Sequence, residues 1–161
     1  YERDLWLPIR QAAEARRKAP RKLAIYGSAI LEAQQRKTIV NLRSAGLEGC
    51  VEVGRGDLLD LQAPAASGVL IANPPYGVRL SDTAELEAFY PKLGDALKAH
   101  WAGWRCYFFS GDPALPKGVR LKASKRTPLF NGAIECRLFE YQMVAGSARK
   151  PKPSDNEELN D

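Results

Sequence analysis

Short apolar runs alternate with helix-like segments along most of the chain, and this alternation limits the possible folds more than any other feature. Four runs have the length of buried strands: 23–26, 51–53, 68–72 and 104–109. Helical patterns occupy residues 1–18, a segment that begins at an N-cap Ser28 and ends at Gly46, and a segment that Pro91 should kink or divide into two short helices. Strands that alternate with helices predict an α/β domain with a largely parallel sheet.

The C-terminal part of the chain has a different pattern. Two further strands, 118–125 and 134–143, are predicted on either side of residues 128–132, and they suggest an antiparallel hairpin. From residue 146 the sequence is rich in Ser, Lys, Pro and Glu and poor in apolar residues. Such a segment buries too little surface to offset its ordering entropy. We therefore predict one domain over 1–145 and a disordered tail over 146–161.

Composition excludes several classes of protein. No apolar run approaches the ~20 residues of a membrane span, so no membrane association is expected. The three cysteines, Cys50, Cys106 and Cys136, are far apart and there is one histidine, which argues against a disulfide framework or a zinc site. We expect buried, reduced cysteines and a cytoplasmic protein without a metal. The net charge is +5, with seven basic and three acidic residues within 1–22. This basic segment is either a solvated helix face or a phosphate-facing patch.

The tetrapeptide Asn73-Pro74-Pro75-Tyr76 directly follows the apolar run 68–72. Ligands of open α/β sheets bind beyond the carboxyl ends of strands, which is where this motif would lie. The side-chain oxygen of Asn73 and the carbonyl oxygen of Pro74 can each accept one N–H of an exocyclic amine. Held in this way, the lone pair of the amine can be directed at an electrophilic methyl group, and the ring of Tyr76 can stack on an extruded base. The alternative is a simple strand-ending turn.

This motif resembles the target site of amino-group methyltransferases that use S-adenosylmethionine. The chain as a whole resembles the bacterial large-subunit rRNA guanine-N2 methyltransferases, a group often labelled N6-adenine-specific DNA methylases. The stretches that carry the resemblance are 25–28, 73–80, 93–95, 103–104 and 128–136. The resemblance implies a Rossmann-like methyltransferase fold, S-adenosylmethionine as cofactor and RNA, rather than DNA, as the main partner.

The resemblance also assigns roles to individual residues. Asn73, Pro74, Pro75 and Tyr76 take the target-amine and base-stacking roles. The cofactor-binding positions are Tyr26, Gly27, Ser28, Asp57 and Asn73. Asp57 matches the position that contacts the adenine of the cofactor, although a turn or helix-cap role accounts for it equally well.

Two departures from the family pattern concern the cofactor. The family has acidic residues at the positions of Ala29 and Leu31, and Glu32 would point elsewhere on a helix. No Gly-rich turn precedes Leu23. The first strand of the fold is therefore expected to be absent from between the runs 23–26 and 68–72. Because a missing central strand would leave backbone groups unpaired, an upstream part of the same protein or a homodimer is expected to complete the sheet.

Several alternatives stay open from the sequence. The motif alone permits adenine N6 or a protein glutamine as target, and the two departures favour a non-catalytic RNA-binding or assembly module, or an inactive fragment. Other candidates are expected to be structural. His100 is interpreted as a cap or surface residue, and Arg79 as a phosphate contact or surface ion pair. Five aromatic residues are assigned to packing: Trp101, Trp104, Tyr107, Phe108 and Phe109.

Overall fold

A computed structural model describes residues 2–74 and 83–145. They form two compact units, Tyr1–Asp57 and Leu58–Asp161, which are treated one at a time. The predicted tail 146–161, together with Pro75, Tyr76 and Arg79, lies outside the described residues.

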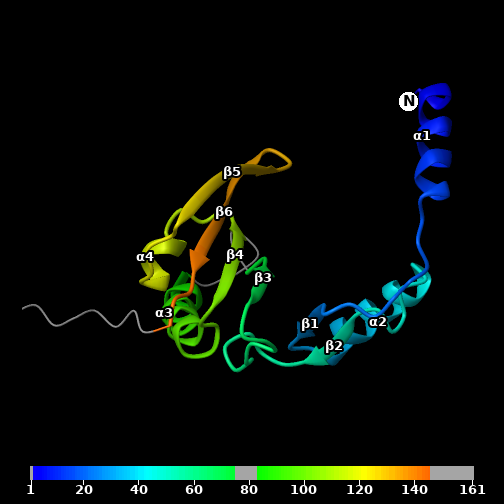
Figure 1. Ribbon diagram of the computed structural model, residues 1–161. Helices are drawn as coiled ribbons and strands as arrows, with labels where there is room; N and C mark the ends of the chain where they lie inside the picture. The colour runs from blue at the N-terminus through cyan, green and yellow to red at the C-terminus, as the bar shows by residue number, and fades with distance from the viewer. Residues whose placement is uncertain (1, 75–82, 146–161) are drawn as a thin grey trace, which may run out of the picture. The chain divides into compact units, whose positions relative to one another are not determined.

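The first unit contains two helices and a pair of strands (Figure 1). These are α1 (Arg3–Ala15), β1 (Tyr26–Ala29), α2 (Glu32–Ser44) and β2 (Glu52–Arg55). β1 and β2 run parallel, with Tyr26 opposite Glu52, and α2 connects them. Gly46 follows α2 with a φ of 68°, the left-handed conformation expected of a helix-ending glycine.

The first strand lies further along the chain than the sequence predicted. We expected residues 23–26, with Gly27 as the stop, but β1 spans Tyr26–Ala29 because its partner strand sets the boundary. The earlier residues make only isolated ladder bonds, such as Leu23 N–H to the Cys50 carbonyl at 3.1 Å. The predicted cap was also wrong: Ser28 lies inside β1, and Leu31 is the N-cap of α2.

The second unit is a four-stranded mixed sheet with two helices. Its elements are β3 (Gly68–Ala72), α3 (Thr83–His100), β4 (Trp104–Ser110), α4 (Leu115–Val119), β5 (Lys125–Asn131) and β6 (Ile134–Gln142). The strand order is β3-β4-β6-β5, with β3 and β4 parallel and the other neighbours antiparallel (Figure 1). The predicted α/β class and C-terminal hairpin are confirmed. Over the described ranges, β3 bonds only β4 and β1 bonds only β2.

One predicted strand of this unit was wrong. The strand expected over 118–125 is instead the end of α4, a loop and the start of β5, which begins at Lys125. We missed α4 because Pro116 and Gly118 are poor helix formers, yet a proline is tolerated in the first turn. Pro91 lies inside a single helix, α3, and not between two short helices. Buried residues on both sides of the proline pack on one core.

The core of the second unit lies between one face of the sheet and the two helices. Cross-strand neighbours such as Phe108 and Phe139 are fully buried there, against Leu93 of α3 and Val119 of α4. The expected packing role is confirmed for Trp101, Trp104 and Phe108, while Tyr107 and Phe109 are half-buried. The three cysteines are buried, as predicted. Alternate residues of β3 face away from this core, and Ile71 is 72% exposed.

Tyr141 provides a test of this core. Its hydroxyl group is buried and has no hydrogen-bond partner in the ranges that the structure covers. A buried donor without a partner costs about 1–3 kcal/mol. We expect Tyr141→Phe to raise the free energy of unfolding at neutral pH by about 1 kcal/mol, measured by urea unfolding with tryptophan fluorescence. A loss of stability would show that the hydroxyl is bonded.

The same variant should change the response to alkali. Burial raises the pKa of Tyr141 from 10.0 to about 12 and that of Cys106 from 9.0 to about 12. The unfolded chain therefore loses these protons first, so stability should be level below about pH 9 and fall as the pH rises towards 12. Tyr141→Phe should make this fall shallower, because it removes one of the buried groups whose pKa is raised.

Candidate active site at the carboxyl edge of the second sheet

Segments distant in sequence meet at one edge of the four-stranded sheet. Parallel β3 and β4 end there, with Ala72 opposite Phe108. The chain then continues into Asn73 and Pro74 after β3, and into residues 111–113 after β4. Because β6 is antiparallel to β4, its first residues, including Glu135, lie at the same edge.

The two described residues of the tetrapeptide differ in exposure. The side chain of Asn73 is exposed at the end of β3, whereas Pro74 is buried. Proline has a fixed φ and no N–H, so this position offers a carbonyl acceptor on a stiff backbone. An amide oxygen and a carbonyl oxygen on consecutive residues are suited to the two N–H groups of an exocyclic amine.

A cavity of about 250 Å³ lies at this edge. Three of its lining residues, Ser110, Cys136 and Phe139, have at most 1% of their surface exposed. The others belong to the turn after β4 and to the start of β6: Gly111, Asp112, Pro113, Glu135 and Arg137. The floor of the cavity is therefore mostly apolar, and its opening carries carboxylate and guanidinium groups.

Asp112 fixes the wall of this cavity. Its Oδ2 accepts a 2.6 Å bond from the Tyr90 hydroxyl of α3, and its Oδ1 accepts a 2.8 Å bond from the Ala114 N–H. The Asp112 N–H donates to Ser110 Oγ at 3.0 Å. Burial, and then the bond to Asp112, raise the pKa of Tyr90 well above its usual 10, so the phenol stays a donor throughout the physiological range. These bonds hold residues 110–114 in one conformation.

The hairpin of β5 and β6 carries two charged lining residues of the cavity and, across the strand pair from one of them, an exposed aromatic ring. Glu135 and Arg137 are two residues apart on β6 and form an ion pair of 3.1 Å between Oε1 and Nη2. Phe130 lies directly opposite Glu135 in the register and is 70% exposed. None of these three residues was predicted to lie at the site. The Gly132 turn could have revealed them, because a two-residue turn at 132–133 sets the pairing of 130 with 135.

In the first unit, two of the expected cofactor residues, Ser28 and Asp57, lie near the carboxyl ends of β1 and β2. Ser28 Oγ donates to the Gly56 carbonyl at 2.9 Å, and the Gly56 N–H donates to the Ala29 carbonyl at 3.2 Å. These bonds fix the backbone before half-buried Asp57. Tyr26 and Gly27 are in β1 itself, with Tyr26 exposed.

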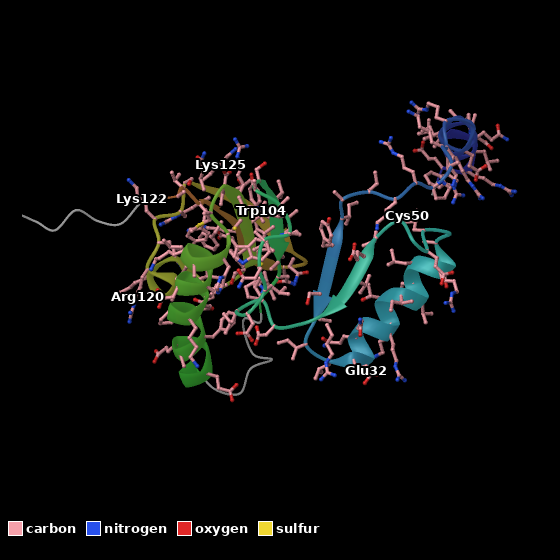
Figure 2. All side chains as sticks on the ribbon, turned by 60° about the horizontal axis from the view of Figure 1, so that its bottom comes forward. Glu32, Cys50, Trp104, Arg120, Lys122 and Lys125 are labelled. Atoms are coloured by element: carbon pink, nitrogen blue, oxygen red, sulfur yellow. The ribbon has the colours of Figure 1, made fainter. Side chains whose placement is uncertain are left out.

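The residues at this strand end fit an adenine better than they fit a ribose. Ile30 and Leu31 are exposed apolar side chains that can cover an aromatic ring, and Asp57 can accept an N–H bond. Ala29 and Leu31 cannot bond ribose hydroxyls. Glu32, labelled in Figure 2 in the first turn of α2, already accepts a bond from Arg36.

Of the remaining candidates, His100 lies within the described residues and Arg79 does not. His100 is the last residue of α3, and its carbonyl accepts a bond from the Ala63 N–H at 3.2 Å. No group of three potential metal ligands occurs in the described part of the chain. Among the same residues, no helix is long and apolar enough to span a membrane.

A comparison with known protein families identifies the family to which this chain belongs. The model of the RMKL-like methyltransferase domain matches residues 1–140. The chain belongs to this family. An RMKL-like domain agrees with the predicted methyltransferase fold, and it explains why the polar groups gather at the carboxyl ends of the strands.

Relatives of this RMKL-like domain are named for ribosomal RNA. The chain is 36% identical over 156 residues to the ribosomal RNA large subunit methyltransferase K/L of Shewanella frigidimarina, covering 95% of the chain and 22% of that protein. The protein of the same name in Syntrophotalea carbinolica is 43% identical over 108 residues, which are 65% of the chain and 15% of that protein. The crystal structure of SMU.472 complexed with SAH superposes with a TM-score of 0.75 at 26% identity, covering 89% of the chain and 38% of SMU.472. The chain thus spans well under half the length of these relatives.

Proposed function

We propose that this domain transfers a methyl group from S-adenosylmethionine to the N2 amine of a guanine in large-subunit rRNA. The observation that carries the proposal is the position of Asn73 and Pro74, which follow β3 at the same sheet edge as a cavity with ionised groups. Membership of a methyltransferase family supports the reaction. The names of the K/L relatives support large-subunit rRNA as the substrate, and the guanine N2 amine is taken from the family resemblance.

The chain's own residues hold the amine. The Asn73 side-chain oxygen and the Pro74 carbonyl each accept one N–H, which fixes the nitrogen and directs its lone pair. This lone pair is delocalised into the ring, so orientation and acceptor bonds that pull on both protons make it available. Tyr76 would stack on the ring, and solvent takes the proton after transfer.

The cofactor would lie against the strand ends of the first unit. S-adenosylmethionine supplies an electrophilic methyl on a sulfonium ion, and SAH, bound to SMU.472, is what is left after transfer. In this chain, Asp57 would accept an adenine N–H, and Ile30 would cover the ring. The strand beneath this cofactor site contains Tyr26, Gly27 and Ser28. The cytoplasm, with its reduced thiols, is the proposed setting.

A non-catalytic RNA-binding module is the second candidate. The observation that favours it is the absence of a carboxylate at Ala29 and Leu31, where the resemblance implies a ribose contact. Such a module would keep the base-binding cavity and lose methyl transfer.

One experiment separates these candidates. The native-length protein is incubated with protein-free large-subunit rRNA and methyl-labelled S-adenosylmethionine, and the RNA is digested and analysed by mass spectrometry. We expect N2-methylguanosine at a single position, which is then mapped. Detection of N6-methyladenosine instead would show that the target base is adenine. RNA binding without any methylated nucleoside would show that the domain is a non-catalytic module.

A further inference from the structure

Glu135 and Arg137 form an ion pair that contributes little to the stability of the fold. Both side chains are well exposed, at 60% and 44%, and join on one face of β6 at 3.1 Å. Exposed pairs of this kind contribute little to stability, because solvent screens them. The pair nevertheless stands at the mouth of the cavity, next to the buried Ser110 and Phe139.

The surroundings of this pair suit a planar ring. Phe130, directly opposite Glu135 on β5, exposes most of its ring on the same face of the hairpin. Arg137 lies opposite Ser110, which lines the cavity. The volume, about 250 Å³, is just under the ~300–1,000 Å³ of sites for drug-sized ligands, and so suits a single base.

We propose that Glu135 and Arg137 read the Watson–Crick edge of the target guanine, with Phe130 covering one face of the base. This inference rests on the proposed function, because it places the N2 amine at Asn73 and Pro74. Next to that amine, guanine presents the N1–H donor and then the O6 acceptor. A carboxylate accepts the first and a guanidinium donates to the second.

The same pair disfavours adenine. Next to its N6 amine, adenine presents an N1 acceptor and then a C2–H, which offers neither a polar donor nor an acceptor. The Glu135 carboxylate would face the N1 lone pair, or Arg137 would bond N1 and leave Glu135 unmatched. The bond between the two residues uses Oε1 of Glu135 and one nitrogen of Arg137. A carboxylate has a second oxygen and a guanidinium has five N–H groups, so both can bond a base without parting.

The test uses 2-aminopurine, which keeps the 2-amine but has an N1 acceptor and no O6. The native-length protein is given RNA with guanine or 2-aminopurine at the mapped position, and kcat/KM is measured for each. We expect a preference for guanine of about 100-fold, because a site built for hydrogen bonds rejects an analogue that lacks them. Glu135→Gln can donate to N1 of 2-aminopurine and should reduce that preference to about tenfold or less. Arg137→Ala should lower kcat/KM for guanine and leave that for 2-aminopurine nearly unchanged.

Two control variants carry the same changes of charge outside the cavity lining. Glu140→Gln lies on β6, and Arg105→Ala lies at the start of β4. Both should keep the wild-type preference. If Glu135→Gln and Arg137→Ala also keep it while the wild-type protein makes N2-methylguanosine, the readout by this pair is wrong and the proposed function stands. If the wild-type protein makes no N2-methylguanosine, the proposed function itself fails, and this readout fails with it.

Discussion

Replacing Asn73 with alanine is expected to lower kcat for RNA methylation by about 10²–10³, the usual cost of removing one hydrogen-bonding group that acts on the reacting centre. The variant removes the side-chain oxygen that holds one amine proton, so the lone pair is no longer oriented. Pro74 and the cavity are unaffected, because Asn73 is exposed at the end of β3. The measurement is single-turnover methylation at saturating RNA and cofactor.

Two further variants make this result specific. Asn73→Asp keeps acceptor oxygens at the same place and is expected to retain more activity than Asn73→Ala. Asn41→Ala makes the same chemical change on the exposed surface of α2 and should leave the rate unchanged. Full activity of Asn73→Ala would remove this residue from the transfer step.

Gly94→Ala is expected to destabilise the second unit by about 3 kcal/mol, the upper part of the usual range for overpacking. Gly94 lies in α3, and a methyl group built there would overlap the carbonyl oxygen of Val119 at the end of α4. That oxygen belongs to the backbone, so relief requires the two helices to separate. The sign is informative, because glycine to alanine within a helix normally stabilises by about 1 kcal/mol.

The neighbouring residue supplies the control for Gly94→Ala. Asp95 is exposed on α3 and bonds Lys98 at 3.0 Å, so Asp95→Ala should change the free energy of unfolding by less than about 0.5 kcal/mol. Urea unfolding reports both variants through Trp101 and Trp104, which are buried in the core and in edge-to-face contact. A stabilised Gly94→Ala variant would mean that α3 and α4 are not in close contact.

Local signals explain which parts of the fold were predictable. Strand 68–72 was predicted with the bounds it has, because it is an uninterrupted apolar run that a proline pair ends. The first strand was misplaced by three residues because Gly27 reads as a stop, although its pairing with Val53 extends the ladder. Cross-strand pairing depends on two segments, so the sequence of one segment alone cannot predict it.

The site also contains a part that the local sequence predicts and a part that only the strand pairing brings together. Asn73 and Pro74 stood out because their chemistry is written in consecutive residues. The cavity is not local: its lining comes from 110–113 and from 135–139, which meet only through the antiparallel register of β4 and β6. Ser28 shows the opposite error, since a serine before a helical pattern suggests a cap, whereas the strand pairing directs its hydroxyl to Gly56.

The hydrogen bond from Tyr90 to Asp112 links the packing of the core to the shape of the cavity, two properties that usually evolve independently. Tyr90 is part of the packed core, and Asp112 shapes the wall of the cavity. If Glu135 and Arg137 read the base as proposed, a substitution that loosens α3 would also change the base selectivity. Core residues of α3 would then be constrained by the accuracy of the proposed modification as well as by folding.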